Sequence, residues 1–176
     1  MKYKDELVRA MTWLGEKENT IFVGQSVEYP GNAMHGTLIN VPKEKKIEFP
    51  VAEEFQMGFA TGLALEGFVP ISMFPRFDFL ILGTNQLVNH LDKINHISNG
   101  GMNPNVIIRT SVGSIRPMHP GLQHCQDHSQ AISKMCQYVN VVELQYPEQI
   151  FSAFESAYNE GVPTILVEYG DFYNEK

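Results

Sequence analysis

Short apolar segments alternate with longer segments of helical periodicity along this chain. The short segments are rich in β-branched residues and therefore predict buried strands. They are Thr20–Gly24, Phe68–Met73, Asn105–Thr110, Val139–Leu144 and Pro163–Glu168. Because strands that alternate with helices form parallel sheets covered on both faces, the pattern predicts an α/β fold with a mostly parallel central sheet. The length of 176 residues suits one domain that spans residues 1–176.

Three apolar stripes with helical spacing lie between the predicted strands. They comprise Leu7, Ala10, Met11 and Leu14; Leu80, Leu87, Leu91, Ile94 and Ile97; and Ile150, Phe154, Ala157 and Tyr158. Asp78 is the expected N-cap of the second helix, which Asn99, Gly100 and Gly101 should end.

Two long segments follow predicted strands, where ligands bind in parallel sheets. They are Gln25–Glu48 and Ser111–Gln126, and both contain several glycines and prolines. Long loops without secondary structure of their own are usually functional. We therefore expect the functional site at these two segments.

Composition narrows the classes of function. Hydrophobic residues make up 43% of the chain, and the formal net charge of −7 disfavours binding to nucleic acid. No apolar run approaches the ~20 residues of a membrane-spanning helix, and the N-terminus lacks the apolar centre of a signal peptide. Cys125 and Cys136 are not spaced as a CxxC motif, which indicates reduced thiols. We expect a cytoplasmic protein with no membrane partner.

The segment around Glu53 combines a carboxylate with a helix of unusual composition. Glu53 follows a short extended run, and Gly58 and Gly62 lie in the helix that begins there. A helical glycine costs about 1 kcal/mol relative to alanine, so the pair suggests that another backbone, such as that of a second subunit, lies close. An acid at a helix start often only interacts with the helix dipole, and Glu54 shares that interpretation. For Glu53, the apolar context favours a carboxylate that shares a proton with a ring nitrogen.

Several segments together resemble a known family. VAEEFQMGFATGLALEG, at residues 51–67, resembles the segment of 2-oxo acid dehydrogenase beta subunits in which Ala-Glu-Gln precedes a helix rich in glycine and alanine. RFDFLILGTNQLVNHLDKINHISNGG, VIIRT and GLQHCQ follow in the family's order at nearly its spacing. The resemblance covers nearly the whole chain and corresponds to the N-terminal half of those beta subunits. It implies the pyrimidine-binding domain of a thiamine-diphosphate enzyme of the transketolase-like superfamily.

The resemblance implies a role for three residues. Glu53 would bond to the pyrimidine ring nitrogen of thiamine diphosphate and so activate the cofactor. Phe79 would pack on the pyrimidine face, and His124 would lie near the thiazolium ring and the substrate as a proton donor or orienting group. By residue type alone, Phe79 could be simple core and His124 a loop residue. The chain departs from the family at Gln25 and Cys125, where an acid and a serine are common.

The resemblance also implies partners. In this superfamily a second domain with a Gly-Asp-Gly motif holds the diphosphate and Mg²⁺, and this sequence contains no such motif. We therefore expect a diphosphate-binding partner subunit, and a heterotetramer in which two copies of this chain associate. We also expect this chain to lack the second, C-terminal domain of the beta subunits. The expected reaction is decarboxylation or oxidative decarboxylation of a 2-oxo acid. Ketol transfer by a half-transketolase is the alternative.

Two interpretations of other classes remain. His119, His124 and His128 could form a zinc site, because His124 and His128 are four positions apart, but no HExxH motif accompanies them. We predict no metal ligands in this chain. The chain could instead be a non-catalytic scaffold or a regulatory copy of the fold. Glu53 argues against that interpretation, since a scaffold needs no carboxylate there.

Overall fold

A six-stranded, all-parallel sheet forms the centre of the computed structural model, which describes residues 1–174. The strands are β1 (Thr20–Gly24), β2 (Lys46–Glu48), β3 (Val69–Phe74), β4 (Ile107–Val112), β5 (Asn140–Glu143) and β6 (Thr164–Tyr169). Their order across the sheet is β2-β1-β3-β4-β6-β5. The predicted α/β class with a mostly parallel sheet is confirmed.

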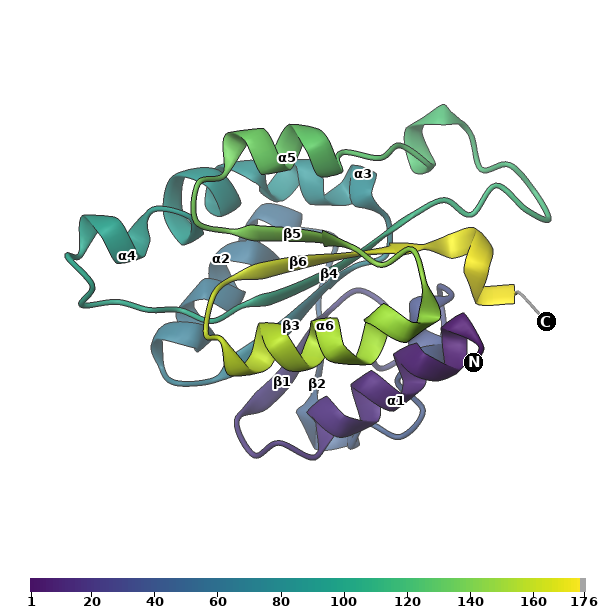
Figure 1. Ribbon diagram of the computed structural model, residues 1–176, viewed down its shortest axis with the longest axis horizontal. Helices are drawn as coiled ribbons and strands as arrows, with labels where there is room; N and C mark the ends of the chain where they lie inside the picture. The colour runs from purple at the N-terminus through teal and green to yellow at the C-terminus, as the bar shows by residue number, and fades with distance from the viewer. Residues whose placement is uncertain (175–176) are drawn as a thin grey trace.

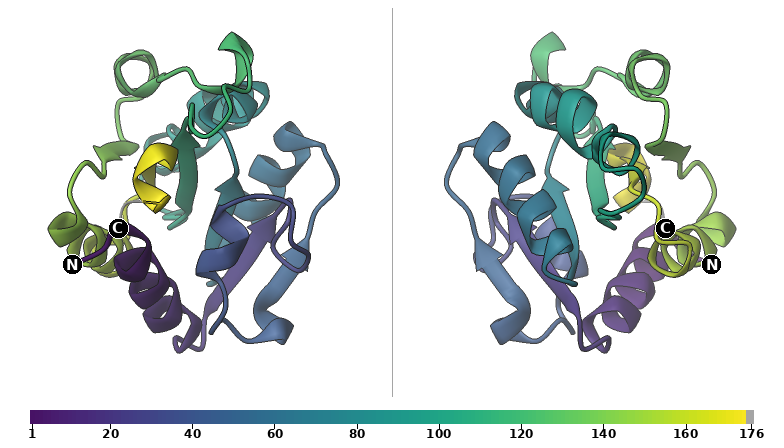
Figure 2. Two further views of the ribbon diagram at one scale, coloured as in Figure 1. Left: turned by 90° about the vertical axis from the view of Figure 1, so that its right-hand side faces the viewer. Right: turned by 90° about the vertical axis from the view of Figure 1, so that its left-hand side faces the viewer.

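Helices cover both faces of the twisted sheet, as Figures 1 and 2 show. The longer ones are α1 (Tyr3–Gly15), α2 (Glu53–Leu65), α5 (Ser129–Met135) and α6 (Pro147–Asn159). Short turns complete the chain: η1 (Met34–Thr37), η2 (Lys43–Lys45), α3 (Phe77–Leu80), η3 (Ile81–Gly83), η4 (Gln86–Leu91), α4 (Ile94–Ile97), η5 (Leu122–His124) and η6 (Gly170–Asn174). Helices α1 and α6 lie side by side on one face, and α2, α3 and α5 lie on the other.

Two hydrophobic cores result, one on each face of the sheet. The first joins the predicted stripes of α1 and α6 to one side of β1, β3, β4 and β6, with Leu7, Phe154 and Phe22 fully buried. The second joins α2 and the segment after β3 to the other side, with Met57, Leu80 and Ile108 fully buried. No helix within residues 1–174 combines the length and apolarity needed to cross a bilayer.

The predicted strands are all present, and β2 is a strand that was not predicted. The predicted segment Asn105–Thr110 begins too early, since β4 starts at Ile107. The Asn105 carboxamide instead donates to the carbonyls of Ala157 (3.3 Å) and Tyr158 (3.1 Å) near the end of α6. The expected loop Gln25–Glu48 contains η1, η2 and strand β2, which pairs with β1 at the edge of the sheet. Three half-buried residues are too few to show a clear alternation.

The prediction that Asp78 caps a long helix is wrong. The second stripe forms α3, η3, the π-helical turn η4 and α4, and Arg76 occupies the N-cap position of α3. The Asp78 carboxylate instead accepts a hydrogen bond from Gln126 Nε2 at 2.8 Å. The predicted end is confirmed, since Asn99 and Gly100 adopt φ angles of 51° and 79° just beyond α4.

The glycines of α2 face no second backbone within residues 1–174. A Cβ added at Gly58 would contact only the Gln86 side chain, at 3.5 Å, and one added at Gly62 would contact nothing within 4 Å. Phe55 on the same helix is 63% exposed. The described residues thus supply no such neighbour, and packing of this face against a second subunit stays a prediction.

Candidate functional site

The carboxyl ends of β1 and β3 meet where the strand order reverses. The connection from β1 leads to β2 on one side, whereas β3 is followed by β4 on the other side. Such a switch point leaves a crevice in which parallel sheets bind ligands. A cavity of about 300 Å³ lies at these ends. Its lining residues are Gln25, Ser26, Gly31, Asn32, Ala33, Met34, Pro75, Arg76, Phe79, Ser111, Gly113, Ser114, Gly170, Tyr173 and Asn174.

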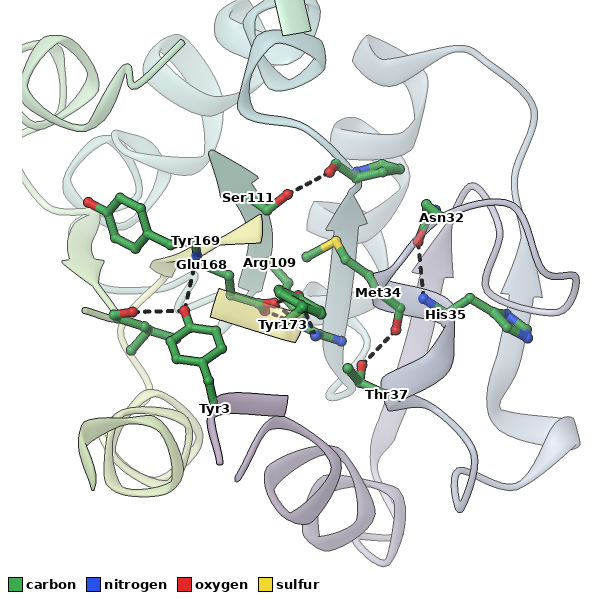
Figure 3. Close-up of polar contacts among 12 residues, drawn as sticks. Tyr3, Asn32, Met34, His35, Thr37, Arg109, Ser111, Glu168, Tyr169 and Tyr173 are labelled. Carbon is green, nitrogen blue, oxygen red and sulfur yellow. Dashed lines mark hydrogen bonds and ion pairs between the residues drawn. The ribbon is translucent and has the colours of Figure 1, made fainter. Parts of the chain in front are cut away.

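The cavity wall is assembled from segments far apart in the sequence. Figure 3 shows Asn32 and Met34 from the segment after β1, Ser111 from β4 and Tyr173 from η6. The Ser111 hydroxyl donates to the Pro75 carbonyl at 2.8 Å and so joins β4 to the end of β3. Hence both loops that the sequence singled out contribute to one cavity.

Glu53 lies beside this cavity as the first residue of α2. It is only 5% exposed, and its Oε1 accepts a hydrogen bond at 3.2 Å from Gln25, which lines the cavity. The Gln56 carboxamide fixes the first turn of α2 to β3 by donating to the Met73 carbonyl at 3.0 Å. Gly83 packs against the same turn, because a Cβ there would lie 3.3 Å from the Glu53 carbonyl oxygen. The carboxylate is therefore buried and held in place.

The other two predicted site residues contact each other. Phe79 lines the cavity, and its ring meets the His124 ring edge-on at 5.8 Å between centroids. The His124 Nδ1 atom is buried and has no hydrogen-bond partner within residues 1–174. His124 itself does not line the cavity. Glu53 is thus linked to the cavity through Gln25, and His124 is linked to it through Phe79.

Arg76 is a site residue that the sequence analysis did not single out. Its Nη1 donates to the carbonyls of Gly113 (2.8 Å) and His124 (2.7 Å), which lie at the two ends of one long loop. The Asp171 carboxylate fixes the start of this loop by accepting from the backbone N–H groups of Ile115 (3.1 Å) and Arg116 (3.2 Å). An arginine directly after a buried strand was the available signal, but its loop partners are remote in sequence.

A buried ion pair contacts Tyr173, which lines the cavity. Arg109 and Glu168, both fully buried, lie on neighbouring strands, and Arg109 Nη2 donates to Glu168 Oε2 at 3.0 Å. Burial alone would lower the pKa of Arg109, but the charge of Glu168 raises that pKa above its usual value. The Tyr173 hydroxyl bonds to Glu168, and burial followed by the Glu168 charge raises the pKa of Tyr173 well above its ordinary value. Tyr173 is thereby fixed as a neutral donor at the cavity wall.

The zinc interpretation is contradicted by the positions of the three histidines. His119 lies 3.8 Å from the Cys125 sulfur, His128 packs against Phe77, and His124 packs against Phe79. His124 ends η5 and His128 precedes α5, so they share no helical face. No group of three His, Cys, Asp or Glu side chains in the part of the chain described gathers closely enough for a metal. Cys125 and Cys136 are unpaired, as expected.

The chain is similar in sequence to beta subunits of 2-oxo acid dehydrogenases. No family model matches the chain. A pyruvate dehydrogenase E1 component subunit beta from Cyanidium caldarium is 27% identical over 93% of this chain and 50% of its own length. The 2-oxoisovalerate dehydrogenase subunit beta of Bacillus subtilis (strain 168) is 25% identical over 98% of this chain and 53% of its own length. The chain therefore spans about half the length of these relatives.

A solved structure shows the same fold. A split gene transketolase, in an inactive beta4 tetramer, superposes with a TM-score of 0.73 at 16% identity, over 96% of this chain and 51% of that chain. At such low identity the likeness concerns the fold. Together these relationships confirm the resemblance inferred from the sequence: the chain is related to the beta subunits of 2-oxo acid dehydrogenases and has a transketolase-like fold.

Proposed function

We propose that this chain is the pyrimidine-binding subunit of a split thiamine-diphosphate enzyme that acts on a 2-oxo acid. The observation that carries the proposal is the position of Glu53, buried at the start of α2 and bonded to Gln25 at the cavity between β1 and β3. Gln25 engages one carboxylate oxygen, which leaves the other for the ring nitrogen of an aminopyrimidine. Glu53 would hold the proton at that nitrogen.

Other residues fit the cofactor as well. The Phe79 ring offers an aromatic face at the cavity wall, which suits a flat heterocycle. The His124 ring packs against Phe79, which lines the cavity, and its buried Nδ1 has no partner within residues 1–174. His124 would orient a substrate oxygen or donate a proton to it. When bound, thiamine diphosphate supplies a carbon nucleophile for a 2-oxo carbonyl group. The residues of this chain would orient the ring and manage protons around it.

We further propose that a partner subunit holds the diphosphate and Mg²⁺. The 176 residues contain no Gly-Asp-Gly motif, and the nearest segment is Gly170-Asp171-Phe172. The Asp171 Oδ1 atom there accepts from the backbone N–H groups of Ile115 and Arg116 and so fixes a loop of this chain. The cofactor would lie between the two subunits, with two copies of each in the assembly.

The outer face of α2 supports self-association in that assembly. Val51, just before α2, is 79% exposed, Phe55 is 63% exposed, and a Cβ at Gly62 would meet nothing within 4 Å. The Phe55 ring pairs with the rings of Phe49 and Phe59 of its own segment, at 5.2 and 6.3 Å between centroids. A second copy of this chain would cover these aromatic side chains and supply the close neighbour that the glycines admit.

Reconstitution with a partner polypeptide tests the proposal. We expect an assembly whose 2-oxo acid decarboxylation requires added thiamine diphosphate and Mg²⁺. Glu53→Gln should lower that activity by about 100- to 10,000-fold, the range for loss of a group that transfers protons. Glu54→Gln is the matched control, because Glu54 is the neighbouring acid of the same helix turn, is exposed, and accepts solvent-exposed hydrogen bonds from the side-chain amides of Asn85 and Gln86. Equal activities of the two variants, or cofactor-independent turnover, would contradict the proposal.

A further inference from the structure

One cation lies in a cavity wall that is otherwise neutral. Arg76 is the sole formally charged residue among those that line the cavity between β1 and β3 in residues 1–174. The remaining polar lining comes from amides and hydroxyls, including Gln25, Asn32 and Ser111. In a protein of net charge −7, a negatively charged ligand needs such a local positive charge.

The guanidinium of Arg76 is oriented but not neutralised. Ion pairs within residues 1–174 involve the cationic groups of Arg9, Lys93, Arg109 and His128, so no carboxylate of this part of the chain pairs with Arg76. Its contacts are the Gly113 and His124 carbonyls, and both are made by Nη1. A guanidinium carries five N–H donors, so the three on Nη2 and Nε remain for a ligand. Because the carbonyls fix the plane of the group, those donors are already oriented before a ligand arrives.

We propose that Arg76 binds the carboxylate of the 2-oxo acid substrate. Three free donors in one plane match the two oxygens of a carboxylate. A sugar phosphate carries a second negative charge, for which the described lining offers no second cation. The inference deepens the proposed function and rests on it for the nature of the substrate. It assigns Arg76 to substrate binding and favours 2-oxo acids over the phosphorylated sugars of ketol transfer.

The proposed carboxylate site adjoins the long loop that carries His124. Arg76 holds the His124 carbonyl at 2.7 Å, and the His124 ring lies against Phe79 at the cavity wall. Arg76 thus closes the long loop and would also bind the anion. Loss of the anion site must therefore be distinguished from loss of the loop contacts.

Binding to the full chain, without cofactor or partner, provides that test. Pyruvate is titrated into ¹⁵N-labelled protein and followed by the backbone amide shifts of residues at the cavity. Pyruvamide serves as a neutral analogue, and inorganic phosphate as the competing anion. We expect Arg76→Met to weaken pyruvate binding by about 10- to 100-fold, the range for loss of charged hydrogen bonds, and to leave pyruvamide binding unchanged. Arg76→Lys, which keeps the charge without the planar fork, should lie between.

Arg116→Met is the matched control, since it removes an exposed arginine of the same loop and should leave pyruvate binding unchanged. If Arg76→Met lost its dispersed spectrum, the folded Arg76→Lys variant would supply the comparison. Equal loss of pyruvate and pyruvamide would reduce Arg76 to a loop-closing residue and overturn the proposal. So would tighter, Arg76-dependent binding of phosphate, or the absence of saturable pyruvate binding in the wild type. Because no cofactor is present, the outcome is independent of whether Glu53 activates thiamine diphosphate.

Discussion

Asp92 fixes the segment that enters β5, and its removal should destabilise the fold strongly. Its side chain is fully buried. Oδ1 accepts hydrogen bonds from three consecutive backbone N–H groups, those of Gln137 (3.0 Å), Tyr138 (2.7 Å) and Val139 (2.9 Å). Lys93 donates to Oδ2. One carboxylate thereby ties the turn after η4 to the strand entry 45–47 positions further along the chain.

These contacts set the magnitude of the effect. A hydrogen bond to a charged group contributes about 1.5–3 kcal/mol, and the three share one acceptor, so their sum is less than additive. We expect Asp92→Ala to lower the free energy of unfolding by about 3–5 kcal/mol. Asp92→Asn keeps an acceptor but loses the charge, which roughly halves the strength of each bond. Its expected cost is therefore about half as large.

Urea unfolding followed by circular dichroism, at one protein concentration, measures both variants. Asp127→Ala is the control, because the Asp127 carboxylate accepts only from Ser129 N and Oγ two positions away and weakly from Tyr169. Loss of such a local cap costs about 1 kcal/mol. A loss for Asp92→Ala no greater than for Asp127→Ala would refute the reasoning.

The contribution of Asp92 should also depend on pH with a defined sign. Burial alone would raise its pKa, but the hydrogen bonds from Lys93 and from the backbone of residues 137–139 lower that pKa below its usual value. A carboxyl whose pKa is lower in the folded state stabilises the fold above its unfolded pKa of about 4. That stability is lost as the pH falls through the folded value. The difference between wild type and Asp92→Asn should therefore be constant near neutrality and shrink below about pH 4.

Two further predictions concern close packing and burial. Gly170→Ala should lower stability by about 1–3 kcal/mol in thermal unfolding, because its Cβ would lie 2.6 Å from the Ser114 nitrogen. Gly62→Ala, with nothing within 4 Å, should instead stabilise the isolated chain by up to about 1 kcal/mol, and equal effects of the two would contradict this packing argument. Burial, with the Asp92 charge, raises the pKa of the Cys136 thiol to about 11. Its alkylation by iodoacetamide, measured by mass spectrometry, should rise about tenfold per pH unit up to that pH, and a plateau near pH 9 would be inconsistent with the raised pKa.

The sequence by itself determined the class of fold and most of its elements. The stripes of α1 and α6 and the apolar runs of the strands report burial through side chains that are near neighbours in the chain. The short motifs around Glu53, Phe79 and His124 were sufficient to identify the related beta subunits. Edge strand β2 was missed, because three half-buried residues leave little periodic signal. The apolar stripe after β3 was recognised, but not its division into α3, η3, the π-helical turn η4 and α4.

Only the tertiary structure decided the strand order and the contacts that complete the site. Arg76 reaches carbonyls 37 and 48 positions away, and Arg109 pairs with Glu168 across 59 positions. Asp78 resembled a helix cap in sequence but bonds to Gln126. Local patterns record which side chains are buried, since burial follows the helix or strand period. Which remote polar groups meet depends on how the sheet and its loops are arranged, and no local period encodes that arrangement.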